Sequence, residues 1–394
     1  MASPPETARA ETTEHVLERR MPRVDSLTGL RWWAAFAVFA YHMLNFAPLP
    51  PLATTFLHYG YFGVTFFFVL SGFVLMWSLA PRVKISTFYW RRVARIYPAH
   101  VVALVVAIPV FYTLGTVPAD SWLKPFDAVA LLLSLVLLQG WVRDPVVFFS
   151  GNPAAWSLTY EAFFYAAFPF VAKALTPWRK RGALVFVAVV TAVFFAYRIL
   201  VALYPDSPLP AVPWPIQHLP EFVIGMALAW AFRCGWLPRI PVVVGVGSLV
   251  LLLAAIALAP RFIPGTGAAF VLGGFSNELV TVACALAITA VAGASVRGRR
   301  SLLALRPMVK LGEWSFAFYL VHATFIYLAL TVFGLQPAGW RNVGWYAVVL
   351  AVSIAGAAAL HLLVEKPLER RMRAWKDRRD ARPRQGELEA VRLP

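Results

Sequence analysis

The stretch LRWWAAFAVFAYH (30–42) decides how this chain folds. It is almost wholly apolar, yet it contains Arg31 and His42, eleven positions apart. In a helix this spacing is about three turns, or about 16 Å, so both side chains share one face. An ionisable side chain inside a membrane-spanning helix is costly and by default marks a functional site. The pair therefore predicts a charged group near one membrane surface and a titratable base deeper in the bilayer.

The rest of the composition extends this apolar character. Hydrophobic residues make up 60% of the 394 residues and charged residues 14%, whereas a soluble protein has about 25% charged residues. Apolar runs of about 17–22 residues recur, and each is long enough to cross the hydrocarbon. Cys234 and Cys284 lie in or at the end of such runs, so we expect packing residues and no metal site. The sequence predicts an all-α integral membrane protein.

The strong positive charge follows the membrane topology. The net charge is +17, and 30 of the 36 Lys and Arg residues fall in six separate segments. This alternation is the positive-inside pattern of a multi-pass protein of the inner (plasma) membrane. A nucleic-acid site would instead gather these residues on one soluble face, so we expect no nucleic-acid partner. The basic segments are 1–28, 81–97, 173–182, 233–240, 293–310 and 365–394.

Counting the apolar runs leaves one run too many. Eleven crossings would put the two basic ends on opposite sides of the membrane. The run 126–142 is short and begins after Lys124-Pro125, so we expect it to form a re-entrant or interfacial helix. This leaves about ten transmembrane helices with both termini cytoplasmic. The runs lie near 29–47, 60–80, 98–116, 126–142, 156–175, 183–203, 217–234, 241–259, 272–292, 311–333 and 343–364.

The chain divides into three parts on this pattern. Residues 1–28 form a polar cytoplasmic segment without the apolar core of a cleaved signal peptide. Residues 29–364 form the membrane domain. The basic tail 365–394 is rich in mixed charge, so we expect a frayed helix followed by disorder.

Depth in the membrane predicts an outward-facing polar chamber. If the first helix runs outward from residue 29, His42 lies about 20 Å up, in the outer half. The run 156–175 must then run inward, which puts Ser157 and Glu161 at a similar depth on one helix face. The same reasoning places His322 near mid-depth. The expected chamber comprises His42, Glu161, Arg198, Glu221 and Glu278.

A second candidate site lies at the inner surface. The segment YWRRVARIYP (89–98) places Arg91 and Arg95 one turn apart, with Arg92 beside them. The planar guanidinium suits phosphate through its fork of donors. The alternative is that these residues anchor the chain to anionic lipid head groups.

Structural explanations compete with the functional ones elsewhere. His322 can simply hydrogen-bond to a neighbouring helix, and Glu161 can pair with a buried arginine such as Arg198. The segment Ser71-Gly72-Phe73 can serve close helix packing. Trp156 can be an interfacial anchor.

Seven segments, in order, resemble the acyltransferase-3 family of integral membrane acyltransferases. They span about 26–371, nearly the whole chain. The segments are SLTGLRWWAAFAVFAYH (26–42), FFFVLSGFVL (66–75), RRVARIYP (91–98), WSLTYEAFFYAAFP (156–169), LPEFVIGM (219–226), LGEWSFAFYLVH (311–322) and VEKPLERR (364–371).

The resemblance implies a reaction and a donor. Such proteins move an acyl group, commonly acetyl, from a coenzyme A thioester to a hydroxyl of a surface sugar, a glycolipid or a secondary metabolite. His42 matches the essential histidine of the family. Many members have an acidic residue where this chain has Thr28. The residues that match the donor-binding arginines are Arg31, Arg91, Arg92 and Arg95.

These observations give a mechanism to test. Imidazole suits general-base work because its pKa lies near neutral, so we expect His42 to deprotonate the acceptor hydroxyl. We expect Glu161 to orient His42, as a carboxylate does in a catalytic triad. An acyl-histidine intermediate on His42 is the variant. The expected acceptor-binding residues are Trp156, Ser157, Tyr160, Arg198, Glu221 and His322.

Two other functions remain open at this point. A secondary transporter or flippase would also have ten spans with buried charges, but it often shows inverted repeats, and none is clear here. A non-catalytic membrane scaffold would leave His42, Glu161 and the arginines without a role.

Overall fold

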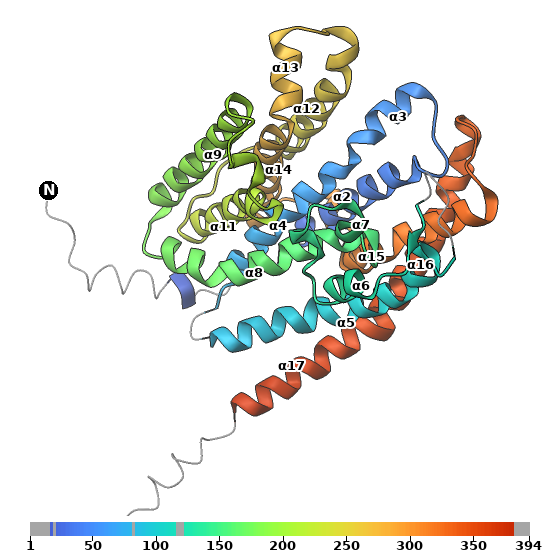
Figure 1. Ribbon diagram of the computed structural model, residues 1–394. Helices are drawn as coiled ribbons and strands as arrows, with labels where there is room; N and C mark the ends of the chain where they lie inside the picture. Colours follow the sequence, from blue (N-terminus) through green and yellow to red (C-terminus); the bar gives the residue numbers. More distant parts are fainter. Residues whose placement is uncertain (1–15, 19–20, 81–82, 116–121, 382–394) are drawn as a thin grey trace, which may run out of the picture.

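The protein is almost entirely helical (Figure 1). The computed structural model describes residues 16–18, 21–80, 83–115 and 122–381. Much of the polar segment 1–28 and the tail end 382–394 therefore lie outside the described residues. The helices of the first half are α2 (Asp25–Met43), α3 (Pro51–His58), α4 (Gly63–Trp77), α5 (Ile85–Phe111), α6 (Ala128–Leu135), α7 (Pro145–Phe148), α8 (Trp156–Leu175) and α9 (Lys180–Leu203).

The second half continues the helical bundle. Within the described parts of the chain, the strands are limited to β1 (Tyr112–Thr113) and β2 (Lys124–Pro125), which pair in parallel. The helices are α10 (Trp214–Gln217), α11 (Leu219–Arg233), α12 (Val242–Phe262), α13 (Gly267–Gly274), α14 (Ser276–Val296), α15 (Arg306–Phe333), α16 (Val343–Leu360) and α17 (Lys366–Asp380).

Seven helical segments of the described chain are long and apolar enough to cross a membrane. α9 is the least buried of them, because only 6% of its most apolar stretch lies inside the protein, and the rest would face lipid. These segments show that the chain is a membrane protein. They are Pro51–Trp77, Ile85–Phe111, Lys180–Leu203, Val242–Phe262, Ser276–Val296, Arg306–Phe333 and Trp340–Asp380.

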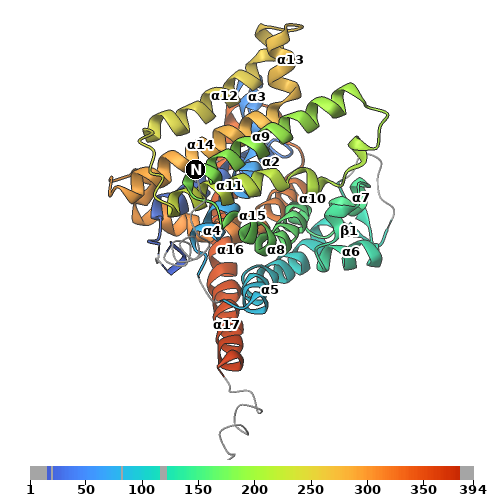
Figure 2. The same cartoon turned by 90° about the vertical axis from the view of Figure 1, so that its left-hand side faces the viewer.

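Three further apolar helices, α2, α8 and α11, pack against the spans of the bundle (Figures 1 and 2). α11 packs on α4 and α9, and every residue of α11 from Glu221 to Arg233 is buried. α2 packs on α15. Neighbouring helices shield α11 and one face each of α2 and α8, and these shielded faces can carry polar side chains that an exposed span could not.

The run 126–142 does not form a spanning helix. Only Ala128–Leu135 is helical in this run (α6), and eight residues reach about 12 Å. The Asp127 carboxylate begins the helix by accepting from the backbone N–H of Val129 at 2.8 Å. The segment then turns at Leu137, whose φ is 60°. A short helix here is what the topology count required.

Close packing of α4 on α11 depends on two glycines. A Cβ at Gly72 would collide with the carbonyl of Phe222, and a Cβ at Gly225 would collide with the carbonyl of Val69. Small residues allow membrane helices to approach this closely. The packing explanation for Ser71-Gly72-Phe73 therefore holds for Gly72.

The beginning of the basic tail is a packed helix rather than a frayed one. α16 passes through a π-helical turn, His361–Glu365, directly into α17. α17 lies along the first half of α5 (Figures 1 and 2). The Trp90 indole N–H donates to the carbonyl of Met372 at 2.7 Å, and the Trp90 and Trp375 rings lie 4.9 Å apart. These contacts hold α17, which the sequence predicts to be cytoplasmic, against α5.

Candidate active site

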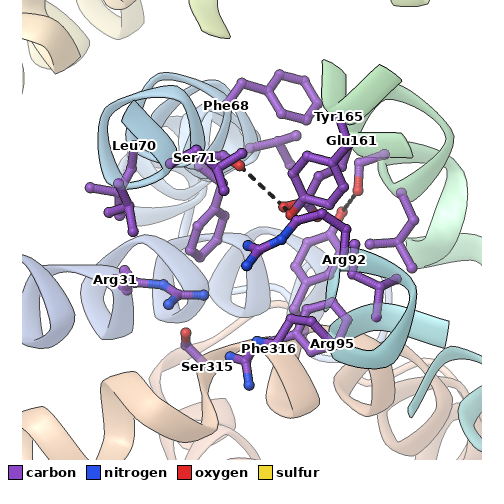
Figure 3. A pocket seen from close by; sticks show the side chains of 18 residues that line it. Arg31, Phe68, Leu70, Ser71, Arg92, Arg95, Glu161, Tyr165, Ser315 and Phe316 are labelled. Carbon is purple, nitrogen blue, oxygen red and sulfur yellow. Dashed lines mark hydrogen bonds between the residues drawn. The ribbon is translucent and has the colours of Figure 1, made fainter. Parts of the chain in front are cut away.

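The first feature is a cavity of about 180 Å³ between α2, α4, α5, α8 and α15. Arg31, Arg92 and Arg95 line it, and we call it the arginine cavity. Figure 3 shows the three guanidinium groups directed toward one space. They come from two helices: Arg31 from α2, and Arg92 and Arg95 from consecutive turns of α5. The tertiary structure therefore brings together most of the expected donor-binding residues.

The four expected arginines differ in their partners. Arg95 pairs with Glu365 and with Glu369, the latter at 3.3 Å. Arg91 pairs with Asp377 at 3.1 Å and does not line the arginine cavity. Within the described residues, neither Arg31 nor Arg92 has a carboxylate within ion-pair distance. Two guanidiniums without a paired acid thus face the cavity, which favours an anionic ligand.

Glu161 lies in the arginine cavity, where it was not expected. Its Oε1 accepts from the Ser71 hydroxyl at 3.2 Å and from the Tyr165 hydroxyl (Figure 3). No hydrogen bond joins Glu161 to His42 in the described structure. The expectation that Glu161 orients His42 finds no contact here, and the carboxylate instead balances the positive charge around it.

The reason lies in the two stripes of α8. Trp156 and Tyr160 lie four residues apart and line a second cavity, whereas Ser157 and Glu161 lie one position further on and line the arginine cavity. One position along a helix turns the side chain by about 100°. Ser157 is buried and shares a hydrogen bond of 2.8 Å with the Tyr319 hydroxyl. The predicted depth in the membrane is the same for both faces of α8, so it could not show that Glu161 and His42 line different cavities.

The second cavity encloses about 720 Å³, and we call it the aromatic cavity. His42, Arg198 and Glu278 line it, together with many Trp, Tyr and Phe side chains such as Trp156 and Tyr160. Three members of the predicted polar chamber are therefore brought together. A large apolar cavity with a few polar groups is the usual form of a small-molecule site.

Glu221 supports the wall of the aromatic cavity from behind. Its side chain is fully buried, and its Oε1 lies 2.8 Å from His218 Nδ1 and 2.9 Å from Asn277 Nδ2. His218 and Asn277 line the cavity. Neither residue was predicted from the sequence, although His218 stands one helical turn before Glu221 and could have been noticed on that spacing.

The two cavities lie next to each other, because Val64 and Tyr319 line both. Arg31 and His42 extend from the same helix, one to each cavity. Arg31 and Val74 also line a third cavity of about 580 Å³. The arrangement is a series of neighbouring spaces, cationic at one end and aromatic at the other, with His42 in the aromatic one.

His322 of α15 lies against His42. The two ring centres are 5.2 Å apart, and His322 is fully buried. His322 Nδ1 lies 2.8 Å from the carbonyl oxygen of Tyr319. His322 does not line the aromatic cavity itself. It therefore contacts the candidate base rather than the space in which an acceptor would lie.

The described residues contain no group of three or more His, Cys, Asp or Glu side chains that could hold a metal ion. Cys234 and Cys284 are free thiols.

Comparison with known proteins gives the family. The family described as "Acyltransferase domain" matches residues 24–362. The chain is 36% identical to Acyltransferase MdmB of Streptomyces mycarofaciens over 377 residues, which cover 89% of this chain and 93% of the relative. It is 25% identical to Nodulation protein 10 of Rhizobium leguminosarum bv. viciae, over 86% of this chain and 91% of the relative.

A third relative matches over a shorter region. The Peptidoglycan O-acetyltransferase OatA of Listeria monocytogenes is 31% identical over 175 residues, which cover 41% of this chain and 26% of the relative. No solved structure matches the chain. The order of the seven sequence segments, the helical bundle and these matches agree, and the chain belongs to the acyltransferase-3 family and is a membrane acyltransferase.

Proposed function

We propose that this protein is a membrane-bound O-acyltransferase that moves an acyl group, most simply acetyl, from acyl-coenzyme A to a hydroxyl of a carbohydrate, a glycolipid or a secondary metabolite. The observation that carries the proposal is that the arginine cavity and the aromatic cavity lie next to each other and share Val64 and Tyr319 as lining residues. A cationic space suits an anionic donor, and an aromatic space suits a ring-bearing acceptor. His42 lies where the two substrates would meet.

The donor binds from the arginine side. Coenzyme A carries several phosphate charges, and Arg31 and Arg92 offer guanidiniums that have no carboxylate within ion-pair distance in the described chain. Arg95 also lines this cavity and offers further N–H donors while it remains paired with Glu365. Arg91 contributes at the surface once its pair with Asp377 opens. The narrow pantetheine arm then passes Tyr319 and brings the thioester carbonyl to His42.

The acceptor binds in the aromatic cavity. Sugar and macrocyclic rings pack well on aromatic faces, and Trp156 and Tyr160 supply such faces beside His42. Arg198 offers hydrogen-bond donors to acceptor oxygens, and Glu221 holds His218 in the wall. Ser157 acts at the boundary between the two cavities through its bond to Tyr319.

The chemistry is one acyl transfer in which His42 is the general base. Its imidazole takes the proton of the acceptor hydroxyl while the oxygen attacks the thioester carbonyl. The tetrahedral intermediate then releases the thiolate, which takes the proton back from the imidazolium and leaves as free thiol. In the variant, His42 is itself acylated and passes the acyl group to the acceptor. Glu161 offsets the charge of Arg31 and Arg92 before the donor binds.

We propose ten crossings with both termini cytoplasmic, in the inner (plasma) membrane. Adding α2, α8 and α11 to the seven apolar spans gives this number. The membrane domain is then 29–364, between the polar segment 1–28 and the basic tail 365–394. Reporter fusions test the topology, because a fusion within 143–155 should report the outer side and one within 293–310 the cytoplasm.

Purified protein in detergent tests the activity. With acetyl-coenzyme A and an acceptor extract, the wild-type protein should release free thiol, and His42→Ala should lower the rate to the uncatalysed background. The His42→Ala protein should still insert and elute as a single species. Full thiol release by His42→Ala would refute the general base, and the absence of release by the wild type with any extract would favour a transporter.

A further inference from the structure

His42 and His322 each retain a buried ring nitrogen without a partner. The atoms are Nδ1 of His42 and Nε2 of His322, and neither makes a hydrogen bond within the described structure. The ring centres lie 5.2 Å apart with the planes inclined by 47°. An unsatisfied buried polar group costs about 1–3 kcal/mol. Two such atoms on facing rings point to an interaction between them.

The backbone fixes the proton of His322. Its Nδ1 lies 2.8 Å from the carbonyl oxygen of Tyr319 and 3.2 Å from that of Phe318. Carbonyl oxygens only accept hydrogen bonds, so Nδ1 of His322 carries the N–H. In the neutral ring, Nε2 is then an acceptor. The unpartnered nitrogen of His322 therefore needs a donor.

The spacing of the rings suits His42 as that donor. A hydrogen bond of about 2.9 Å between ring nitrogens, each about 1.1 Å from its ring centre, gives a centre-to-centre distance of about 5 Å. The terminal torsion of a histidine is broad, so a modest rotation of the His42 ring brings Nδ1 to Nε2.

We propose that His322 is a positioning residue for His42, whose Nδ1–H it accepts on Nε2. The inference rests on the proposed role of His42 as the general base. The bond selects the tautomer of His42 that has its lone pair on Nε2, the nitrogen that would face the acceptor hydroxyl. When Nε2 takes the proton of the hydroxyl, the positive ring still donates through Nδ1. His322 remains neutral throughout, and the proton passes on to the departing thiolate.

The residues around His42 favour an imidazole, rather than a carboxylate, as the acceptor of its Nδ1–H. Glu161, the carboxylate expected beside His42, lies in the arginine cavity with Ser71 and Tyr165. The Phe318 ring stacks on His322 at 5.8 Å and 13°, which holds the orientation of that ring. A neutral partner also avoids a buried negative charge in the middle of the bilayer, which would be costly.

Two amide variants of His322 separate positioning from packing. His322→Gln places its terminal amide near the position of Nε2, so its oxygen can accept from His42. His322→Asn places its amide near Nδ1, so it keeps the bond to Tyr319 but lacks the acceptor. With purified wild type, His322→Gln and His322→Asn, we expect the Asn variant to lose about 100-fold in kcat with little change in either KM. We expect the Gln variant to stay within about tenfold of the wild type.

The outcomes separate the inference from the proposed function. Equal kcat values for the Asn and Gln variants, or a loss confined to KM, would overturn the positioning role while leaving His42 as the base. A wild-type protein without donor-dependent thiol release, or an active His42→Ala variant, would overturn the proposed function itself.

A measurement on the wild-type protein does not depend on whether the variants fold. Nitrogen-15 NMR of histidine-labelled protein, with His42 assigned by comparison with His42→Ala, reports which ring nitrogen carries the proton. The inference predicts a proton on Nδ1 of neutral His42, against the usual preference of free histidine for Nε2. A proton found on Nε2 would refute it.

Discussion

At the scale of single residues, the arginines differ more than their spacing indicates. Arg91 and Arg95 have carboxylate partners, whereas Arg92 lies over the rings of Phe88 and Tyr165 at 5.8 Å. A cation that already has a salt bridge gains less from a new anion than one that has only aromatic neighbours. We therefore expect an arginine without a carboxylate partner to contribute more to donor binding than one that already has a salt bridge.

Arg92→Gln should therefore weaken donor binding more than Arg91→Gln. A charge-assisted hydrogen bond contributes about 1.5–3 kcal/mol, which corresponds to about a 10- to 100-fold rise in KM for the acyl donor. Arg91→Gln, the matched control, should change this KM by less than about threefold, because its side chain does not line the cavity. Steady-state kinetics with varied donor measures both. Similar effects on the KM of the acceptor would support lipid anchoring instead.

Lys124 gives the aromatic cavity a charge that depends on pH. It lies in β2, outside the spanning helices, and burial lowers its pKa to about 8. The folded chain loses this proton as the pH rises through 8, whereas the unfolded chain keeps it to about pH 10.4. Folding therefore gains stability as the pH rises between these values.

The free amine of Lys124 should react early with an acylating reagent. At about pH 8.5, just above the pKa of Lys124, peptide mass spectrometry should show faster labelling of Lys124 than of the same lysine in unfolded protein. The unfolded sample is the control because its amine remains mostly protonated. Slower labelling in the folded protein would contradict the lowered pKa or show that reagent does not reach the cavity.

At the scale of helices, the π-helical turn between α16 and α17 positions one arginine of the cavity. Glu365 ends this turn with its side chain fully buried. It accepts from Arg95 and lies 3.0 Å from His361 Nδ1. π-Helical turns are rare and often occur at functional sites. The π-helical turn before α17 therefore contacts Arg95 of the arginine cavity through this ion pair.

Glu365→Gln should destabilise the protein far more than Asp377→Asn. Removing one partner of a fully buried pair costs about 3–5 kcal/mol, and an exposed pair contributes below about 1 kcal/mol. The loss for Glu365→Gln should lie between these limits, because Arg95 is 26% exposed and keeps its pair with Glu369. The side chain of Glu365 is 0% exposed, and that of Asp377 is 54% exposed. Thermal unfolding in detergent should show a fall in Tm of several degrees for Glu365→Gln and little change for Asp377→Asn. Equal Tm values would show that α17 is not held by this pair.

At the scale of the whole molecule, the proposed reaction requires a passage between the two cavities. Val64 and Tyr319 line both spaces, and Val64 is 8% exposed. In the proposed reaction, the arm of the donor passes between these two residues to reach His42. The proposal therefore places the two substrates on either side of Val64 and Tyr319.

Val64→Trp should close this passage. We expect donor binding, measured by calorimetry, to stay within about threefold of the wild type while kcat falls about 100-fold, because misplaced reacting groups lose that much. Val64→Leu is the control for the loss of valine and should retain most activity. Unchanged turnover in Val64→Trp would show that the substrates meet by another route.

Several features could be predicted from the sequence, because each depends on neighbours along the chain. Hydropathy predicts the long spans, and the short run at 126–142 does not cross. The predicted helix periodicity puts Arg31 and His42 on one element, and the ordered motifs indicate the acyltransferase family. α11 shows the limit of hydropathy, because its 15 residues are short for a span and are shielded by other helices.

The tertiary structure decided which side chains meet. Glu161 and Ser157 face the arginine cavity, because a turn of about 100° per residue separates them from Trp156 and Tyr160. Local spacing says which residues share a stripe of α8, but the helices packed around it select the cavity that each stripe faces. The sequence by itself determined a membrane bundle with an arginine and a histidine on its first helix. Only the packing of α15 against α2 decided that His42 faces a second histidine, because that contact joins residues 280 positions apart, whose pairing no local pattern encodes.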